Sequence, residues 1–358
     1  MIARRFVTAL LATLPLGTAH AAIFCPANET ELRQALATAA TNNEDDDIRL
    51  RPGTFYTGGL KFAFNSAQDN SLSISGGWTD TLTLWCSQQS PSAAATILDG
   101  QGLTAVLDIQ AYDFGVNGAN KTVALTNLTI RNGYSTTQGE SAGLNLAVGK
   151  QTLRLQNTLL HGHNQAVSGA PNIYTNAITL IGYNDVYVIN NALYDLHSKY
   201  ANLGLFTVYA SQTVYMHNNT LVLSGAGFPA LLDSNNGTAY RIVNNAIVGD
   251  PYFNSRNASD VIRAWLYFNI GNWYVGNINP QPAIQADVGN QHNANPGFVS
   301  AQDPRPALGS PLVNAGLNAP FGGSSAVDLD GNPRVDLGTI DVGAWESTRE
   351  RIFANGFQ

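Results

Sequence analysis

One short pattern occurs five times between Val123 and Asp250, and it constrains the fold more than any other feature of this chain. In each copy an Asn stands between two short runs rich in Val, Ile, Leu and Tyr. This composition favours strands over helices. Repeats of this length indicate stacked units that bury an apolar face only against their neighbours. The sequence therefore predicts an all-β coil of parallel strands, with a ladder of one Asn per turn: Asn127, Asn157, Asn191, Asn219 and Asn245.

Two further motifs accompany the repeats. Thr96-Ile-Leu-Asp-Gly100 and Leu128-Thr-Ile-Arg-Asn-Gly133, with an Asn-x-(Leu/Ile) in each copy, resemble the right-handed parallel β-helix proteins of the pectin-lyase-like superfamily. The resemblance covers residues 46–300 and implies a single right-handed β-helix over that range. The superfamily contains lyases, hydrolases, epimerases and adhesins, so the resemblance implies a fold and does not single out a reaction.

Residues 1–21 have the composition of a secretory signal peptide. Arg4 and Arg5 give a positive start, an apolar run extends from Phe6 to Leu16, and Ala19-His20-Ala21 fits a cleavage site. The apolar run is too short to cross a bilayer, and no later segment of the sequence is a better candidate. We therefore expect an exported protein, extracellular, at the cell surface or periplasmic, without a transmembrane segment.

The charge of the mature chain narrows its range of partners. The signal peptide holds two of the 18 basic residues and none of the 25 acidic ones, so the mature chain has 16 against 25, a net charge of −9. Nucleic acids are bound mainly through Lys and Arg, and an acidic polymer would be repelled unless a cation bridged the two. We expect no nucleic-acid partner, and we expect a monomer.

The segment before the repeats, residues 22–45, predicts a helical cap. Asn28 and Glu31 form a capping box ahead of four apolar positions on one face of a short helix. Such a helix can cover the open edge of the first coil. Cys25 and Cys86 are the only cysteines of the chain, and an even number in an exported protein predicts a disulfide between them.

Length differences between the repeats collect in one place, between the end of one coil and the start of the next. Four such segments are Tyr134–Ala142, Asn164–Asn176, Ser198–Asn202 and Ala226–Pro229. We expect them to project from one corner of the coil as a wall. Loops on a rigid scaffold often carry binding and catalytic residues, so the foot of this wall is the best candidate for a site.

Polar residues occupy the position four residues after the repeat Asn, at the foot of the wall. Arg131, His161 and Asp195 are expected to form a column on three successive coils, about 4.8 Å apart. An Asp can fix the tautomer of a neighbouring His, and an Arg can hold a carboxylate, so these three are the candidate catalytic residues. Because side chains alternate across a strand, the column could instead point inward and form a buried hydrogen-bonded network.

A second group of residues is expected to bind a substrate rather than act on it. Two histidines, His163 and His197, are expected to be adjacent two residues beyond the column. Tyrosines recur on successive coils, where exposed rings would suit the faces of sugars, although strand faces also use Tyr for ordinary packing. The candidate substrate-binding residues are His163, His197, Lys199, Tyr183 and Tyr209.

The sequence lacks the signatures of known polysaccharide-cleaving sites. A Ca²⁺-dependent lyase needs several carboxylates close together, and a glycoside hydrolase needs two carboxylates facing the scissile bond. No such group is found, and Asp99 and Asp108 are interpreted as solvated acids. We expect no metal site and no cofactor, with Ca²⁺ possible but unsupported by a ligand cluster. Whether the protein is an enzyme, and then a lyase or a hydrolase, stays open.

Three blocks near the C-terminus, Ser310–Gly316, Val327–Arg334 and Thr339–Glu346, resemble the choice-of-anchor Q region that closes many exported bacterial β-helix proteins. The resemblance covers the region 301–346 and implies an exported, often surface-associated protein. Asp328-x-Asp330-Gly is similar to the start of a Ca²⁺ loop, but the remaining ligands are missing, so a turn is expected. Residues 347–358 form a tail that either serves sorting or covers the last coil.

The sequence thus predicts an all-β protein, a single right-handed parallel β-helix solenoid with a short N-terminal helical cap and an irregular C-terminal cap. Two functions fit this fold. The first is an exported protein that binds or acts on extracellular or cell-surface polysaccharide. The alternative is a non-catalytic surface protein, such as an adhesin or an envelope component. Fold alone does not decide between them.

Overall fold

The computed structural model consists mainly of strands, and α1 (Glu29–Ala39) is the only α-helix among the residues that it describes. The described residues are 21–112, 120–167, 176–198, 206–210, 212–223, 230–234, 239–248, 251–254, 260–262, 265–267, 274–275, 286–288, 291–292, 295–300, 302–319, 323–335 and 338–347.

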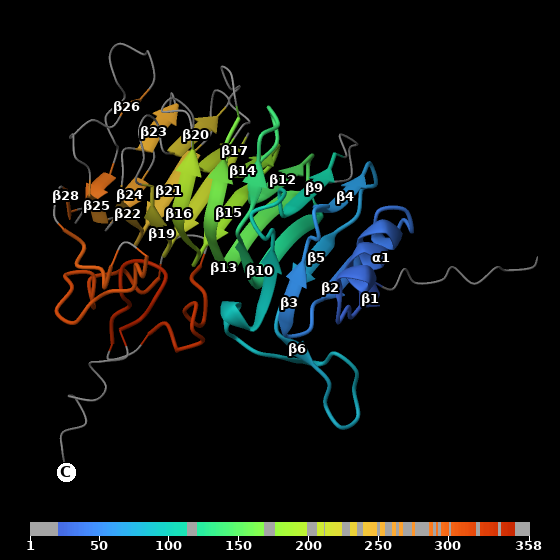
Figure 1. The fold of residues 1–358 in the computed structure, drawn as a ribbon. Coiled ribbons are helices and arrows are strands. Elements are labelled where there is room, and N and C mark those ends of the chain that lie inside the picture. Colours follow the sequence, from blue (N-terminus) through green and yellow to red (C-terminus); the bar gives the residue numbers. More distant parts are fainter. Residues whose placement is uncertain are drawn as a thin grey trace, which may run out of the picture.

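Three columns of parallel strands run through the protein, and the chain visits them in the same order each time (Figure 1). The first column contains β1 (Ala22–Phe24), β2 (Asp46–Arg49), β5 (Leu72–Ser75), the first part of β10 (Thr122–Arg131), the first part of β13 (Thr152–Gln165), β15 (Val186–Ile189), β18 (Thr213–His217), β21 (Ala239–Val243), β24 (Asp260–Ile262) and β27 (Ala286–Val288).

The second column contains β3 (Gly53–Tyr56), β8 (Thr96–Asp99), the second parts of β10 and β13, β16 (Ala192–Ser198), β19 (Thr220–Val222), β22 (Ala246–Val248), β25 (Trp265–Tyr267) and β28 (Gln291–His292). The third column contains β4 (Phe62–Ser66), β9 (Leu107–Ala111), β12 (Leu144–Val148), β14 (Ile178–Gly182), β17 (Phe206–Ala210), β20 (Ala230–Ser234), β23 (Pro251–Asn254) and β26 (Tyr274–Val275).

The first two columns belong to one 18-stranded sheet, and the third column forms an 8-stranded sheet. Three short elements lie outside the columns: β11 (Tyr134–Ser135) beside the end of β13, the antiparallel pair β6 (Trp78–Thr79) and β7 (Gln88–Gln89), and the 3₁₀ turn η1 (Ala93–Ala95). The predicted all-β fold of parallel strands is confirmed.

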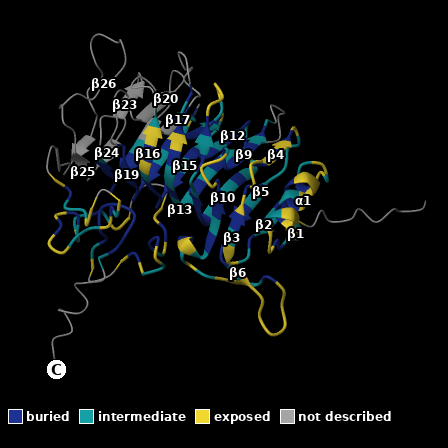
Figure 2. Cartoon of the chain, in the orientation of Figure 1, coloured by how far each residue is buried: buried dark blue, intermediate teal, exposed yellow. Residues whose placement is uncertain are grey.

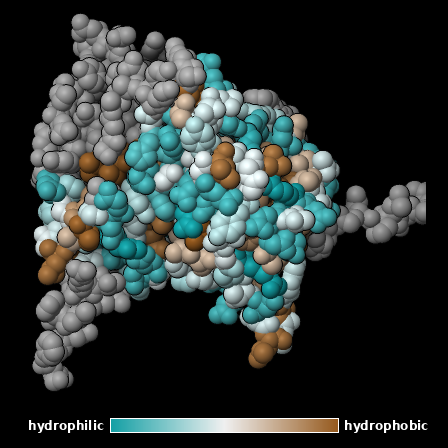
Figure 3. Space-filling model, in the orientation of Figure 1, coloured by the Kyte–Doolittle hydropathy of each residue, from teal (hydrophilic) through white to brown (hydrophobic). Residues whose placement is uncertain are grey.

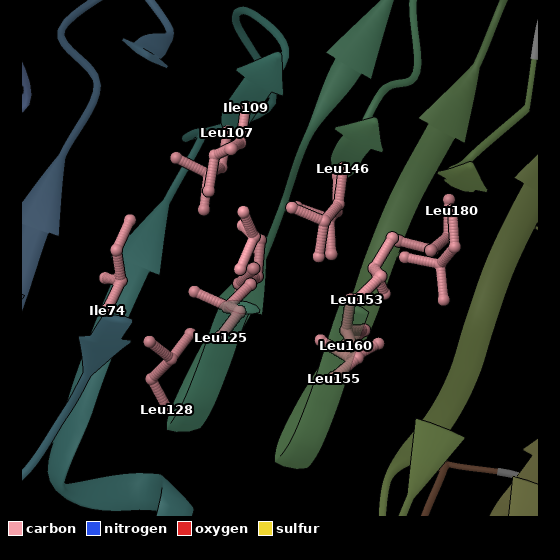
Figure 4. Close-up of a cluster of buried hydrophobic side chains, with 14 of the residues drawn as sticks. Ile74, Leu107, Ile109, Leu125, Leu128, Leu146, Leu153, Leu155, Leu160 and Leu180 are labelled. Carbon is pink, nitrogen blue, oxygen red and sulfur yellow. The ribbon is translucent and has the colours of Figure 1, made fainter. Parts of the chain in front are cut away.

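Apolar side chains from all three columns meet between the sheets. Leu107 and Ile109 on β9 alternate with the more exposed Asp108 and Gln110, as expected for a strand with one face in the core. Figure 4 shows residues of this core, which includes Leu125, Leu146 and Leu180, all of them fully buried. Buried residues line the interior along the described part of the chain (Figure 2).

The Asn residues of the repeats divide into two rows with different tasks. Asn127 and Asn157 are opposite in register, and the row continues through Asn190, Asn218 and Asn244. All five have positive φ, between 52° and 58°, a left-handed conformation that Asn tolerates better than other non-glycine residues. They form the bend between the first and second columns.

The second row is a buried ladder of side chains. It runs from Thr158 through Asn191 and Asn219 to Asn245, with successive hydrogen bonds of 2.7, 3.0 and 2.8 Å. The predicted ladder was therefore one residue out of register: Asn127 and Asn157 lie in the bend, whereas Asn191, Asn219 and Asn245 point inward. In each Asn-Asn pair the sequence pattern alone does not distinguish the Asn in the bend from its buried neighbour.

The N-terminal part of the chain forms the expected short helix and disulfide. Asn28 is the N-cap of α1 and accepts the backbone N–H of Glu31 at 3.0 Å, while the Glu31 carboxylate accepts the N–H of Ala27 at 2.7 Å. Cys25 and Cys86 are bonded to each other, which confirms the predicted pair. Among the described residues, no helix is both long enough and apolar enough to cross a membrane.

The C-terminal region consists of turns and lies along the flank of the strand columns, below them in Figure 1. The side-chain amides of the left-handed row hold its backbone: Asn190 donates to Val327 O and Asn244 donates to Leu317 O, at 3.0 and 2.9 Å. The buried Arg334 pairs with Glu346 at 2.7 Å. The region thus covers the bend over several repeats, whereas an irregular cap on the last coil was predicted.

Candidate functional site

The polar column predicted at the foot of the wall is present with different members. Strand register places Asp99, Arg131, His161 and Tyr194 opposite one another on four adjacent strands. Asp195 lies outside this column, opposite Gly162, and both residues have positive φ at a second bend of the chain. The prediction that Arg131, His161 and Asp195 lie in one column is wrong. The repeat of Asn191 was aligned one residue out of register with the repeat of Asn157, and such a slip moves every side chain of the strand to another position.

Asp99 and Arg131 form a satisfied ion pair. Arg131 Nε lies 2.8 Å from Asp99 Oδ2, and the backbone N–H of Gln101 and the side chain of Asn132 also donate to this carboxylate. Burial alone would raise the pKa of Asp99, but these three donors hold it below the ordinary value. Asp99 was expected to be a solvated acid; instead it is buried.

His161 lies next to this pair and stacks on the ring of Tyr194, with 5.0 Å between ring centroids. Burial, and then the charge of Arg131, lower the pKa of His161, so the imidazole is neutral near pH 7. Asp99 is the buried member of this column, whereas Arg131, His161 and Tyr194 are half-buried, so the column matches neither an open catalytic row nor the fully buried network of the alternative interpretation. A catalytic role for Arg131, His161 and Asp195 stays a prediction.

His163 and His197 are not neighbours in register, contrary to expectation. His163 is opposite Leu196 and fully buried, and its Nδ1 accepts the N–H of Gly133 at 3.0 Å. His197 is opposite Asn164 and exposed, with its Nε2 2.9 Å from Asp195 Oδ1. Burial lowers the pKa of His163 to about 3. His163 is therefore out of reach of a ligand at the surface, and the register slip explains why His197 is not its neighbour.

The remaining predicted binding residues are partly described. Lys199 lies outside the described residues. Tyr183 is exposed and contacts the half-buried Tyr209 edge to face, with 5.9 Å between ring centroids. The related Tyr187 and Tyr215 stack on each other at 4.5 Å, and the guanidinium of Arg154 covers Tyr187. This stack occupies ring faces that a sugar would need, so of these tyrosines Tyr183 is the best placed to meet one.

A pocket that the sequence did not reveal lies on the outer face of the third column. Its volume is about 230 Å³, and it is lined by Lys61, Ala105, Asp108, Gln110, Thr137–Ser141 and Asn145. Asp108 and Asn145 lie opposite each other on the adjacent strands β9 and β12. The segment 137–141 belongs to the first predicted wall segment, which therefore contributes to a candidate site on a different face from the one expected; most of the other three predicted segments lies outside the described residues.

Lys61 lies between two carboxylates in this pocket. Its Nζ is 2.9 Å from Asp108 Oδ2 and 2.7 Å from Glu140 Oε1. The side chains of Gln110 and Asn145 donate to Asp108 Oδ1 at 3.0 and 2.8 Å. Asp108 is thus a shared acceptor for three donors rather than the solvated acid that was expected.

The electrostatics of the pocket follow from these contacts. Burial opposes the charged forms of both Asp108 and Lys61, but hydrogen bonds outweigh it: Asp108 accepts from Lys61, Gln110 and Asn145, and Lys61 donates to Asp108 and Glu140. The pKa of Asp108 is lowered and the pKa of Lys61 is raised. Both groups therefore stay charged at neutral pH.

Hydrogen bonds hold the wall segment over the pocket. Ser135 Oγ donates to Glu140 Oε2 at 2.7 Å, and Ser141 Oγ donates to Thr179 Oγ1 at 2.7 Å. Glu140 therefore keeps one orientation toward Lys61. Neither Lys61 nor Glu140 belongs to a repeated motif, and they are 79 residues apart in the chain. Only the inclusion of Glu140 in a variable wall segment could have indicated it from the sequence.

No cluster for a metal ion is found in the described part of the chain, where no three or more His, Cys, Asp or Glu side chains converge. At the sequence that is similar to a Ca²⁺ loop, Asp328 Oδ1 instead accepts the backbone N–H groups of Asp330 and Asn332, at 3.0 and 2.7 Å. This is the geometry of a turn stabilised by an Asp side chain.

Comparison with known proteins assigns neither a family nor a function to this chain. No protein family, curated protein or solved structure matches the chain.

Proposed function

We propose that this protein is an exported right-handed parallel β-helix of the pectin-lyase-like type, closed by a choice-of-anchor Q-like region, that binds extracellular or cell-surface polysaccharide. The coil is supported by the constant order in which the chain visits the three strand columns and by the left-handed Asn at each bend. Export is supported by the signal-peptide composition of residues 1–21 and by the Cys25–Cys86 disulfide.

The observation that carries the binding proposal is the pocket around Lys61, Asp108 and Glu140. It combines two carboxylates, an ammonium group and the two amides of Gln110 and Asn145 in about 230 Å³, on a surface held by strands. Sugar hydroxyls both donate and accept hydrogen bonds, and a few fixed polar groups in a concave site are the usual way to orient such a ligand.

The same contacts favour binding over cleavage. A glycoside hydrolase needs one carboxyl group that is protonated and gives its proton to the leaving oxygen. Here Lys61 pairs with both carboxylates, and the pKa of Asp108 is lowered. A lyase with a Lys base needs a neutral amine, but the pKa of Lys61 is raised by the same two partners. The pocket is therefore better suited to hold a glycan than to break one.

Mature protein, residues 22–358, tests the proposal against a panel of neutral and acidic polysaccharides. Binding is followed by affinity electrophoresis, and cleavage is followed by unsaturated-product absorbance and by new reducing ends, with and without Ca²⁺. We expect retardation by at least one polysaccharide without either product. Turnover would assign an enzyme instead, and a folded protein that binds none of the panel would favour the non-catalytic surface protein.

A further inference from the structure

A projecting loop carries an exposed apolar patch that the proposed function does not use. The loop connects β6 and β7 and extends from the body of the protein (Figure 1). Leu82, Leu84 and Trp85 are 106, 63 and 59% exposed, and the space-filling view shows apolar surface at the end of this projection (Figure 3). Single exposed apolar residues are normal, but a cluster of three within four residues of sequence indicates a binding surface.

The loop is held in one conformation. Leu84 N–H donates to Thr81 Oγ1 at 3.0 Å, and Ser87 N–H donates to Thr79 O at 3.0 Å. At its base, Asp80 accepts the N–H of Cys86 at 2.8 Å, and Cys86 is bonded to Cys25. Because the loop backbone that carries the apolar side chains is already ordered, binding through them costs less ordering entropy than it would in an unstructured loop.

A groove lies beside this loop. Its volume is about 380 Å³, and β1, α1 and the loop residue Trp85 line it. Ile23 and Phe24 of β1 and Ala35 of α1 contribute apolar surface, and Ile23 is 48% exposed. Within the described residues β1 pairs with β2 alone, so its other edge has no strand partner in that part of the chain. A projection, a groove and an open strand edge thus share one end of the molecule.

We propose that this end binds a second copy of the chain in a twofold-symmetric dimer. In such an interface the same patch serves on both subunits, so each loop can enter the groove of the other copy. A flat lipid surface would cover the loop but leave the groove and the β1 edge empty.

The charge of this surface supports the same partner. The mature chain is strongly acidic, so two copies repel each other over most of their surface. The loop from Asp80 to Ser87 has one charged residue, Asp80, and both its oxygens accept from Arg51 Nη2, at 2.9 and 2.8 Å. The projecting loop therefore meets a second copy without net charge.

Molar mass in solution tests the proposal directly. Mature protein with its disulfide intact is measured by sedimentation velocity and light scattering over a hundredfold range of concentration. We expect twice the chain mass, falling to one chain mass on dilution. The double variant Leu82→Asp/Leu84→Asp and the groove variant Ile23→Asp should both be monomers with unchanged circular dichroism.

Leu308→Asp is the matched control, because Leu308 is 63% exposed like Leu84 but lies in the C-terminal region. It should remain a dimer. A wild-type monomer at every concentration, or a dimer that all three variants retain, would overturn the proposal. Cosedimentation of monomeric protein with phosphatidylcholine vesicles, lost in the loop variant, would also overturn it and assign the loop to a lipid surface.

Discussion

The side-chain amide of Asn191 donates a hydrogen bond of 3.0 Å to the side-chain oxygen of Asn219, and both residues are fully buried. Asn219 repeats the contact with Asn245 and also donates to Val188 O at 2.7 Å. Its oxygen accepts the backbone N–H of Asn191 as well. One side chain therefore satisfies polar groups on both neighbouring strands in a place that water does not reach.

Substitution of a ladder residue should be far more damaging than substitution in the left-handed row. Asn219→Gly leaves the buried backbone N–H of Asn191 without its acceptor and removes the side-chain hydrogen bonds to Val188 O and Asn245 Oδ1, and we expect a loss of about 3–5 kcal/mol of unfolding free energy. Asn157→Gly should lose only about 1 kcal/mol, because Gly adopts positive φ readily and one side-chain hydrogen bond, from Asn190, is removed. Urea unfolding followed by circular dichroism measures both. Equal losses would contradict the division into two rows.

The two Asn rows also show which parts of the fold could be predicted from the sequence. The repeat period and the alternation of apolar residues predicted parallel strands, because burial of one face imposes that pattern. The Asn-Asn pairs left two registers open, since either Asn could form the bend. Asn191 was aligned with Asn157, and the slip put Asp195 in the place that Tyr194 occupies opposite His161.

The pocket was missed for a different reason. Lys61, Asp108 and Glu140 come from three separate segments, and their approach depends on how the wall segment folds over the third column. No periodicity relates them. The sequence predicted that variable segments gather at one corner, but it did not indicate which face the first of them covers.

The buried ion pair of the C-terminal region should be essential for its docking. Arg334 is 1% exposed, pairs with Glu346 at 2.7 Å and also donates to Gly343 O and Asn218 O. Arg334→Met leaves a buried carboxylate without its cation, and we expect a loss of about 3–5 kcal/mol. Arg305→Met is the control, because its partners Asp303 and Asp330 are exposed and such pairs contribute under about 1 kcal/mol. Thermal unfolding of both variants provides the comparison, and a small effect at Arg334 would speak against docking through this pair.

The buried His163 should make the protein sensitive to acid. Its pKa is about 3 in the folded chain, mainly through burial and then through the charge of His161, against an ordinary value of 6.5. Between these two pKa values the imidazole of His163 is protonated in the unfolded chain and neutral in the folded chain. The unfolding free energy therefore decreases as the pH falls from 6.5 toward 3. His163→Asn keeps an acceptor for Gly133 N–H and should flatten this dependence.

The acid experiment needs a control variant, and it must allow for a second buried histidine. His197→Asn is the matched control for the replacement of a His by Asn, because His197 is exposed. His217 has its pKa lowered to about 4 by burial, so some acid sensitivity should persist in the His163 variant. Urea midpoints at intervals between pH 3 and 8 measure the profile. Parallel profiles for wild type and His163→Asn would show that this residue is not the cause.

The disulfide should stabilise the N-terminal cap. Cys25 and Cys86 are 61 residues apart. A disulfide that closes a loop of that size lowers the entropy of the unfolded chain, which raises the unfolding free energy by about 4 kcal/mol at 25 °C. The double variant Cys25→Ser/Cys86→Ser should therefore lose roughly that amount at the urea midpoint. Reduced wild-type protein should match the variant, and a variant as stable as the oxidised protein would refute the prediction.

The most direct test of polysaccharide binding in the pocket is calorimetric titration of pocket variants with the polysaccharide that the panel identifies. Asp108→Asn and Glu140→Gln remove one carboxylate charge each, and we expect binding at least tenfold weaker, about 1.4 kcal/mol, with the fold retained. Asp47→Asn removes a comparable ion-paired carboxylate, held by Arg49 at 2.7 Å outside the pocket, and should bind like wild type. Wild-type affinity in both pocket variants would contradict the assignment.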